Sequence, residues 1–175
     1  GDSGRALCEV ETQSTRPDAQ YHPLVESDDF SEWNPEQKRL FGTFGWKSCW
    51  QFNHEPELSW IENDAEKGCL RMVCRKQCKN VTQAVNTITQ RMKFPVCITE
   101  VTVDAEGIKD GDYAGMCALQ GCYGIAAVTK RDGQMLLVMR SLEAEHDSIE
   151  GNQGNSEEIE WEAVAVESSK IRIRM

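Results

Sequence analysis

Long apolar runs are absent from this sequence. Hydrophobic residues make up 39% of the chain, yet they occur in short groups, and none approaches the roughly 20 consecutive apolar residues of a membrane-spanning helix. We therefore expect no membrane partner. An initiator methionine and an apolar signal segment are also missing, which is typical of a piece excised from a longer protein.

Basic residues are scarce relative to acidic ones. Lysine and arginine number 19 against 29 aspartates and glutamates, so the net charge is -10, which repels polyphosphates. We expect no nucleic-acid partner; neutral sugars, cations or proteins fit better. A length of 175 residues suits one domain. Residues 1–26 are polar without a hydrophobic period and predict a linker or extended arm, which leaves 27–175 as the domain.

Histidine is rare, whereas cysteine is not. The chain holds 3 histidines and 8 cysteines. Cys74 and Cys78 are close in sequence, but no second close pair has zinc-ribbon spacing. Most cysteines have apolar neighbours, as around Cys97 and Cys117, and there we expect reduced thiols that act as small hydrophobic side chains. Such cysteines favour a reducing, cytoplasmic location.

A helical period is almost absent, and alternating segments replace it. Gly/Asp-rich turns separate these segments, including Arg131-Asp132-Gly133, a hairpin signal. The pattern predicts an all-β fold, an antiparallel β-sandwich. The expected strands are 46–52, 58–61, 68–74, 86–91, 95–103, 113–119, 123–130, 135–140 and 170–175.

Residues 143–162 contain eight acids and neither lysine nor arginine. This composition predicts a solvated mobile loop, with an ion site as the alternative.

Aromatic residues concentrate in 46–60. On a regular strand Trp46, Trp50 and Phe52 leave from one face because their spacing is even. Such a row is either part of the core or a platform for a flat ligand. A polar turn that contains Pro56 follows it, at 53–57.

Three motifs, in this order, carry a resemblance to a known family. They are Asn53-His54-Glu55-Pro56, Asn86-Thr-Ile-Thr-Gln90-Arg91 and Gly111-Asp112-Tyr113-Ala114-Gly115, accompanied by Asp28-Asp29-Phe30-Ser31, Trp60, Leu70-Arg71 and Tyr123-Gly124. From residue 27 to about 175 the chain resembles the concanavalin A-like C-terminal domain of glycoside hydrolase family 43, the β-xylosidases and α-L-arabinofuranosidases.

The resemblance implies a two-sheet jelly roll packed against a five-bladed propeller that carries the catalytic acids. The accessory domain of that family sends a loop toward the propeller's pocket. No propeller sequence precedes residue 27 here, and the chain ends where the family pattern has further strands. We expect either a shortened sandwich or one that is incomplete at its C-terminus, with an unpaired edge.

Independent catalysis is not expected. Glu55 and Glu57 are the acids nearest to His54, but a proline separates them and alternate strand residues point to opposite faces. We therefore predict that the chain alone is no enzyme and has no catalytic residues.

Three functions remain open: a module that docks on a catalytic propeller and completes its pocket, a stand-alone binding module for xylan-type oligosaccharides or polysaccharides, or a purely structural or protein-interaction domain. Sugars need an aromatic plate with amide, carboxylate and guanidinium partners around it. The candidates from residues and resemblance together are Trp46, Trp50, Phe52, Asn53, His54, Glu55, Trp60, Asn86, Gln90, Arg91, Tyr113 and Tyr123. For Asn86, Gln90 and Arg91 the alternative is a buried network that ties the sheet to the 53–54 turn.

No cofactor is expected beyond one structural calcium ion, with Asp28 and Asp29 as its candidate ligands and the Asp110/Asp112 turn as a further source. If the parent is a secreted hydrolase, the location is extracellular instead of cytoplasmic.

Overall fold

The computed structural model describes residues 18, 23–33, 45–93, 95–143 and 157–175. Within this part of the chain, strands and two short 3-10 helices are the regular elements, and every named strand pair is antiparallel. The prediction of an all-β antiparallel fold is confirmed.

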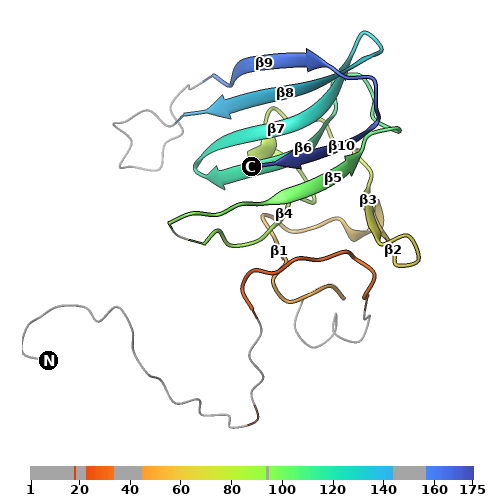
Figure 1. Ribbon diagram of the computed structural model, residues 1–175, viewed down its shortest axis with the longest axis vertical. Coiled ribbons are helices and arrows are strands. Elements are labelled where there is room, and N and C mark those ends of the chain that lie inside the picture. Colours follow the sequence, from red (N-terminus) through yellow and green to blue (C-terminus); the bar gives the residue numbers. More distant parts are fainter. Residues whose placement is uncertain (1–17, 19–22, 34–44, 94, 144–156) are drawn as a thin grey trace, which may run out of the picture.

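Four consecutive strands form the main sheet, in the order β6-β7-β8-β9 (Figure 1). They are β6 (Tyr113–Gln120), β7 (Cys122–Arg131), β8 (Gln134–Leu142) and β9 (Ile159–Ala165). Asp132 and Gly133 join β7 to β8 with φ angles of 50° and 78°, the left-handed pair that a type I′ hairpin turn requires. The Asp-Gly signal in the sequence therefore has the predicted structure.

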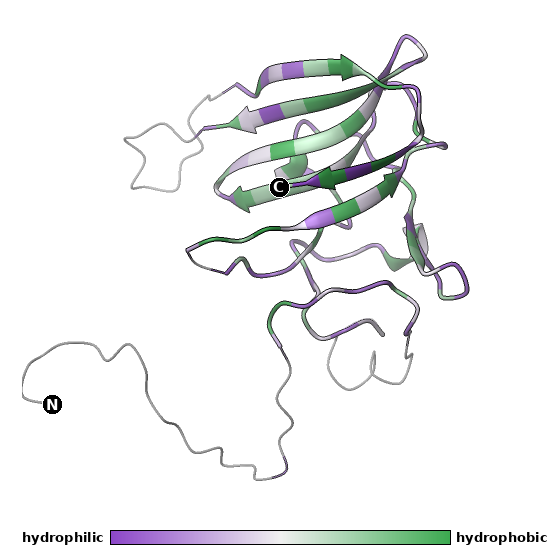
Figure 2. Cartoon of the chain, viewed as in Figure 1, coloured by the Kyte–Doolittle hydropathy of each residue, from purple (hydrophilic) through white to green (hydrophobic). Residues whose placement is uncertain are grey.

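A smaller sheet packs against one half of the main sheet. It consists of β5 (Glu100–Asp104) and β10 (Lys170–Arg174), and β5 contacts β6 while β10 contacts β7. Ile173 of β10 and Val128 and Val138 of the main sheet are buried. Figure 2 shows hydrophobic residues along these strands and hydrophilic ones in the turns that connect them. The core lies here because alternating strands place their apolar residues between the sheets.

The N-terminal half contains short ladders. They are β1 (Gln51–Phe52) with β4 (Ile88–Thr89) and β2 (Ile61–Asp64) with β3 (Cys69–Met72), and the 3-10 helices are η1 (Leu58–Trp60) and η2 (Val81–Gln83). Glu57 caps η1 by accepting a hydrogen bond from the backbone N–H of Ser59. Side-chain hydrogen bonds to the backbone contribute much of the order in this half.

Several predicted strands are wrong in extent. Segment 46–52 is regular only at 51–52, segment 86–91 only at 88–89, and segment 95–103 only from residue 100. Most of segment 58–61 is the helix η1. In 86–91 the reason is visible at Asn86, whose φ of 64° breaks the strand before it begins.

Strand β9 begins inside the stretch 143–162 that was predicted as an acidic mobile loop, so that prediction is wrong over 159–162; residues 144–156 lie outside the described residues. The acids in and just before β9 are compatible with a strand because arginines of β7 and β8 pair with them. Arg131 binds Glu160, and Arg140 binds Glu158 at 2.7 Å. Composition alone does not identify this strand, because the arginines that pair with these acids lie on other strands.

The cysteines differ from the expected buried pattern. Seven lie among the described residues as free thiols, and Cys49 is the buried one of these. Cys69, Cys74 and Cys122 are exposed, since they fall at strand ends and turns whose side chains face solvent. The prediction that cysteines act as small core side chains is therefore wrong for these three, although their reduced state is compatible with the structure.

Candidate functional site

The polar turn 53–57 projects from the surface. Asn53, His54 and Glu55 are exposed, whereas Pro56 is half-buried. The backbone N–H of Asn53 donates to the carbonyl of Thr87 at 3.0 Å, which continues the β1–β4 ladder by one bond. The turn therefore leaves the sheet from a fixed point and presents three polar side chains to solvent.

His54 is oriented by a backbone carbonyl. Its Nε2 contacts the carbonyl oxygen of Thr82, next to η2, and the amide of Asn53 lies 3.2 Å from the same nitrogen. A carbonyl only accepts and the NH2 group of asparagine only donates, so Nε2 can form a hydrogen bond with one of these two partners but not with both.

A shallow hollow of about 410 Å³ lies beside the turn. The β6–β7 turn and η2 form its other walls, so three separate segments meet there. Its lining residues are Asn53, His54, Thr82, Gln83, Leu119 and Gly121. The last four were missed by the sequence analysis, because no local motif signals that these segments meet.

Asn86 holds the far end of the turn. Its Oδ1 accepts from the backbone N–H of Glu57 at 2.9 Å, and its Nδ2 donates to the carbonyl of Glu57 at 3.0 Å. Asn86 is only 6% exposed. The side chain therefore imitates a β-ladder partner for one residue; the tie predicted for Asn86 was to residues 53–54, and Asn86 holds Glu57 at the other end of the turn instead.

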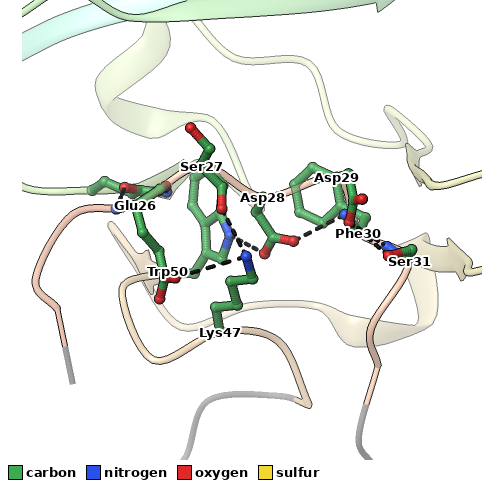
Figure 3. Close-up of polar contacts among 9 residues, drawn as sticks. Glu26, Ser27, Asp28, Asp29, Phe30, Ser31, Lys47 and Trp50 are labelled. Carbon is green, nitrogen blue, oxygen red and sulfur yellow. Dashed lines mark hydrogen bonds and ion pairs between the residues drawn. The ribbon is translucent and has the colours of Figure 1, made fainter. Parts of the chain in front are cut away.

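Gln90 forms the same pair of backbone hydrogen bonds, here called a clamp, with another segment of the chain. Its Oε1 accepts from the N–H of Glu26 at 3.1 Å, and its Nε2 donates to the carbonyl of Glu26 at 3.0 Å. Lys47 donates to the carbonyl of Ser27 at 2.7 Å (Figure 3). Gln90 thus anchors the 23–33 segment, whereas Arg91 is exposed.

The aromatic row predicted for 46–52 is absent, because turns occupy most of this segment. Trp46 is buried and packs on Phe52, with ring centroids 5.6 Å apart. Trp50 stacks on Phe30 at 5.6 Å, and its Nε1 donates to Asp28 at 2.8 Å. The rings therefore form two separate pairs, and Trp60 is half-buried in η1.

The two candidate tyrosines lie on the main sheet, near opposite ends of the β6–β7 hairpin. Tyr123 is opposite Leu119, next to the hollow, and its hydroxyl donates to Glu158 at 3.1 Å. Tyr113 begins β6, six residues away or roughly 20 Å along the strand. Arg140 stacks over its ring at 4.9 Å. The structure brings Tyr123 toward the turn region and leaves Tyr113 apart from it.

The candidate calcium ligands face a cleft of about 300 Å³ that also contains Lys47. Asp28 accepts from the N–H of Phe30 and from Trp50, and Asp29 accepts from the hydroxyl and N–H of Ser31. These bonds from Ser31 hold the pKa of Asp29 below its usual value. The described residues contain no group of three or more metal-ligating side chains. A lysine ammonium in the cleft opposes a cation, so the residues present fit calcium poorly.

Comparison with known proteins identifies the fold family. The family model for the β-xylosidase C-terminal concanavalin A-like domain of glycoside hydrolase family 43 matches residues 41–174. The chain belongs to this family. The resemblance drawn from the motifs is therefore confirmed for the module, and the match is to a C-terminal module and not to a catalytic domain.

A solved structure supports the assignment. A chain from Bacteroides eggerthii described as "Bifunctional GH43-CE" superposes with a TM-score of 0.72 at 29% identity. The alignment covers 98% of the present chain and 20% of that chain, so the module spans about a fifth of the protein it matches. A search of curated protein sequences gives no match. In the described part of the module, no helix has the length and apolarity needed to cross a membrane.

Proposed function

We propose that this chain is a non-catalytic accessory module of a xylan- or arabinan-degrading glycoside hydrolase. It docks on a catalytic propeller and presents the turn 53–57 to the substrate pocket. The observation that carries this proposal is an exposed polar turn that is anchored at both ends: Thr87 holds Asn53, and the buried Asn86 holds Glu57.

Anchoring matters because a loop that is ordered before binding loses little conformational entropy when it docks. His54 adds a third attachment through the Thr82 carbonyl. The turn therefore offers Asn53, His54 and Glu55 in a defined geometry, as a loop that completes a pocket needs.

Stand-alone carbohydrate binding is the second candidate. The hollow beside the turn favours it, because Leu119 supplies an apolar surface and Asn53, His54 and Gln83 supply hydrogen-bonding groups. An aromatic platform is less favoured, since Trp46, Trp50 and Phe52 pack within the module. The side-chain amides of Asn86 and of Gln90 both bind backbone atoms, so Asn86 supports the turn at Glu57 and Gln90 holds the 23–33 segment at Glu26.

A chimera tests docking. The segment of the Bacteroides eggerthii chain that this module matches is replaced by the module, and hydrolysis of aryl xylosides and arabinosides is measured. We expect glycosidase activity to be retained and His54→Ala to raise KM severalfold. Val96→Ala, at an exposed position outside the turn, is the matched control and should change nothing. Unaltered kinetics of the His54→Ala chimera would refute a role in the pocket.

Calorimetry separates the two candidates. A stand-alone site binds xylo-oligosaccharides with a Kd between about 1 μM and 1 mM, or roughly -8 to -4 kcal/mol. We expect no heat of binding from the isolated chain, and a loss of stability from Trp50→Ala. Sugar binding that a still-folded His54→Ala variant loses would overturn this order of the candidates, because His54 lines the hollow.

The isolated chain is also expected to hydrolyse no aryl glycoside, because its family match is to a C-terminal module and not to a catalytic domain. Turnover that disappears in Glu55→Gln would contradict this expectation.

A further inference from the structure

The turn between β7 and β8 is held from outside the hairpin by Asp110, which lies in the loop before β6. Asp110 and Lys130 form an isolated parallel β-bridge, and the backbone N–H of Gly111 donates to the carbonyl of Lys130 at 2.9 Å. Beyond this bridge the Asp110 carboxylate reaches the turn, where its two oxygens accept from the backbone N–H of Gly133 at 3.2 and 3.3 Å. A residue 23 positions earlier in the chain therefore occupies the only donor of Gly133.

The residues of this turn, Asp132 and Gly133, form a chemically labile pair. Both are exposed, and among the described residues no atom lies within 4 Å of the position that a Cβ on Gly133 would take. Because glycine has no Cβ, its backbone nitrogen can approach the side-chain carboxyl carbon of the preceding aspartate closely. An exposed Asp-Gly pair with open space around it therefore permits an attack of the backbone on the side chain.

The reaction requires no reagent besides water. A new bond between the nitrogen of Gly133 and Cγ of Asp132 closes a five-membered succinimide ring, and one carboxyl oxygen leaves as water together with the proton of the nitrogen. Water then opens the ring. When the bond to the main-chain carbonyl breaks, Gly133 stays joined to the chain through the side chain of Asp132, which has become isoaspartate. The mass of the protein is unchanged, and the backbone gains one methylene.

The contact with Asp110 opposes the first step. The glycine nitrogen attacks after it has lost its proton, and the Asp110 carboxylate binds that proton in a charge-assisted hydrogen bond. A negative carboxylate beside the nitrogen also disfavours a second negative charge there. The other Asp-Gly pair of the sequence, Asp110-Gly111, is held in a comparable way, because the N–H of Gly111 is bound in the bridge to Lys130.

We propose that Asp132 is a site of spontaneous isomerisation to isoaspartate and that Asp110 is the residue that keeps this modification slow. The site matters for the fold because the turn sets the register of the β7–β8 hairpin, in which Arg131 lies opposite Gln134. A type I′ turn has two central residues, and an additional backbone methylene between them no longer fits that geometry. The isomerised module therefore loses order at this end of the main sheet.

The test is prolonged incubation of the intact chain near neutral pH, followed by mass spectrometry of the tryptic peptide 132–140, in which electron-transfer fragmentation identifies isoaspartate. We expect isoaspartate at Asp132 to form about fivefold faster in Asp110→Ala than in the wild type, the factor that corresponds to one exposed hydrogen bond. Asp112→Ala is the matched control, because its carboxylate lies in the same loop and accepts from the N–H of Lys109 instead. It should react as the wild type does. Circular dichroism checks folding, and Asp110→Ser replaces Asp110→Ala if that variant does not fold.

Amide hydrogen exchange of Gly133, measured by NMR, is the second readout. Base-catalysed exchange removes the same proton as the first step of isomerisation, so the exchange rate should rise in Asp110→Ala and stay constant in Asp112→Ala. Equal rates of isomerisation in Asp110→Ala and the wild type would refute the protective role. A slower reaction in Asp110→Ala would also refute it, because Asp110 would then act as the base that removes the proton. Absence of isoaspartate at Asp132 from every variant would refute the modification site itself.

Discussion

Replacing Asn86 by alanine is the sharpest test of how this module holds its exposed turn. The substitution removes both hydrogen bonds to the backbone of Glu57, worth about 1 kcal/mol each. It also forces alanine into a φ of 64°, where a residue with a Cβ and no polar side chain loses about 1 kcal/mol. We expect the free energy of unfolding to fall by about 3 kcal/mol and the melting temperature to fall by about 6–12 °C.

Urea denaturation monitored by circular dichroism measures this loss. Asn53→Ala is the matched control, an exposed asparagine of the same turn, and should change stability by less than about 0.5 kcal/mol. A loss below about 1 kcal/mol in Asn86→Ala would mean that the clamp is dispensable. The turn would then lack the preorganisation on which the proposed docking depends.

Four further outcomes are expected. Because Asp28 and Asp29 already accept hydrogen bonds beside a lysine, adding Ca²⁺ or EDTA should leave the melting temperature unchanged; a rise with Ca²⁺ would establish an ion site. Thiol titration of the denatured, unreduced protein should find most of the eight cysteines free, and fewer than two would indicate an oxidised protein. In the folded protein Cys117 should react slowly with thiol reagents, because burial raises its pKa to about 11, and rapid reaction near neutral pH would contradict this. Burial, together with the charge of Glu158, raises the pKa of Tyr123, so its hydroxyl stays protonated in the fold while the unfolded chain ionises near pH 10. Its contribution to stability is complete below that pH and is lost as the pH rises further; Tyr123→Phe should remove this alkaline dependence, measured by urea denaturation from pH 8 to 11.

Local signals explain what could be predicted. The hairpin from β7 to β8 follows from alternation on both sides of Asp132-Gly133, and β10 follows from the alternation of Ile171 and Ile173 with basic residues. These patterns succeed because side-chain direction along a strand depends on neighbouring residues alone. The family motifs add specificity that the alternation by itself does not have.

Predictions failed where a distant partner decides the conformation. The strand β9 is acidic, and its place in the sheet depends on Arg131 and Arg140 of other strands. Trp46 and Trp50 were expected on one face, but the turn between them sends each ring to a different partner. The periodicity of neighbouring residues does not tell which distant side chain each of these residues contacts.

The sequence by itself determined an antiparallel β protein of one family, and it singled out the polar turn, because motif spacing and alternation are properties of neighbouring residues. The tertiary structure alone decided which of those residues act as supports. Asn86 reaches Glu57 across 29 positions, and Gln90 reaches Glu26 across 64. An amide side chain can bind the N–H and C=O of any backbone residue that packing brings close to it. Such clamps therefore form only after the chain has folded back on itself, and the sequence does not show which residue is held. The same folding brings β5 and β10 into contact with β6 and β7 of the main sheet, although β8 and β9 lie between β7 and β10 along the chain.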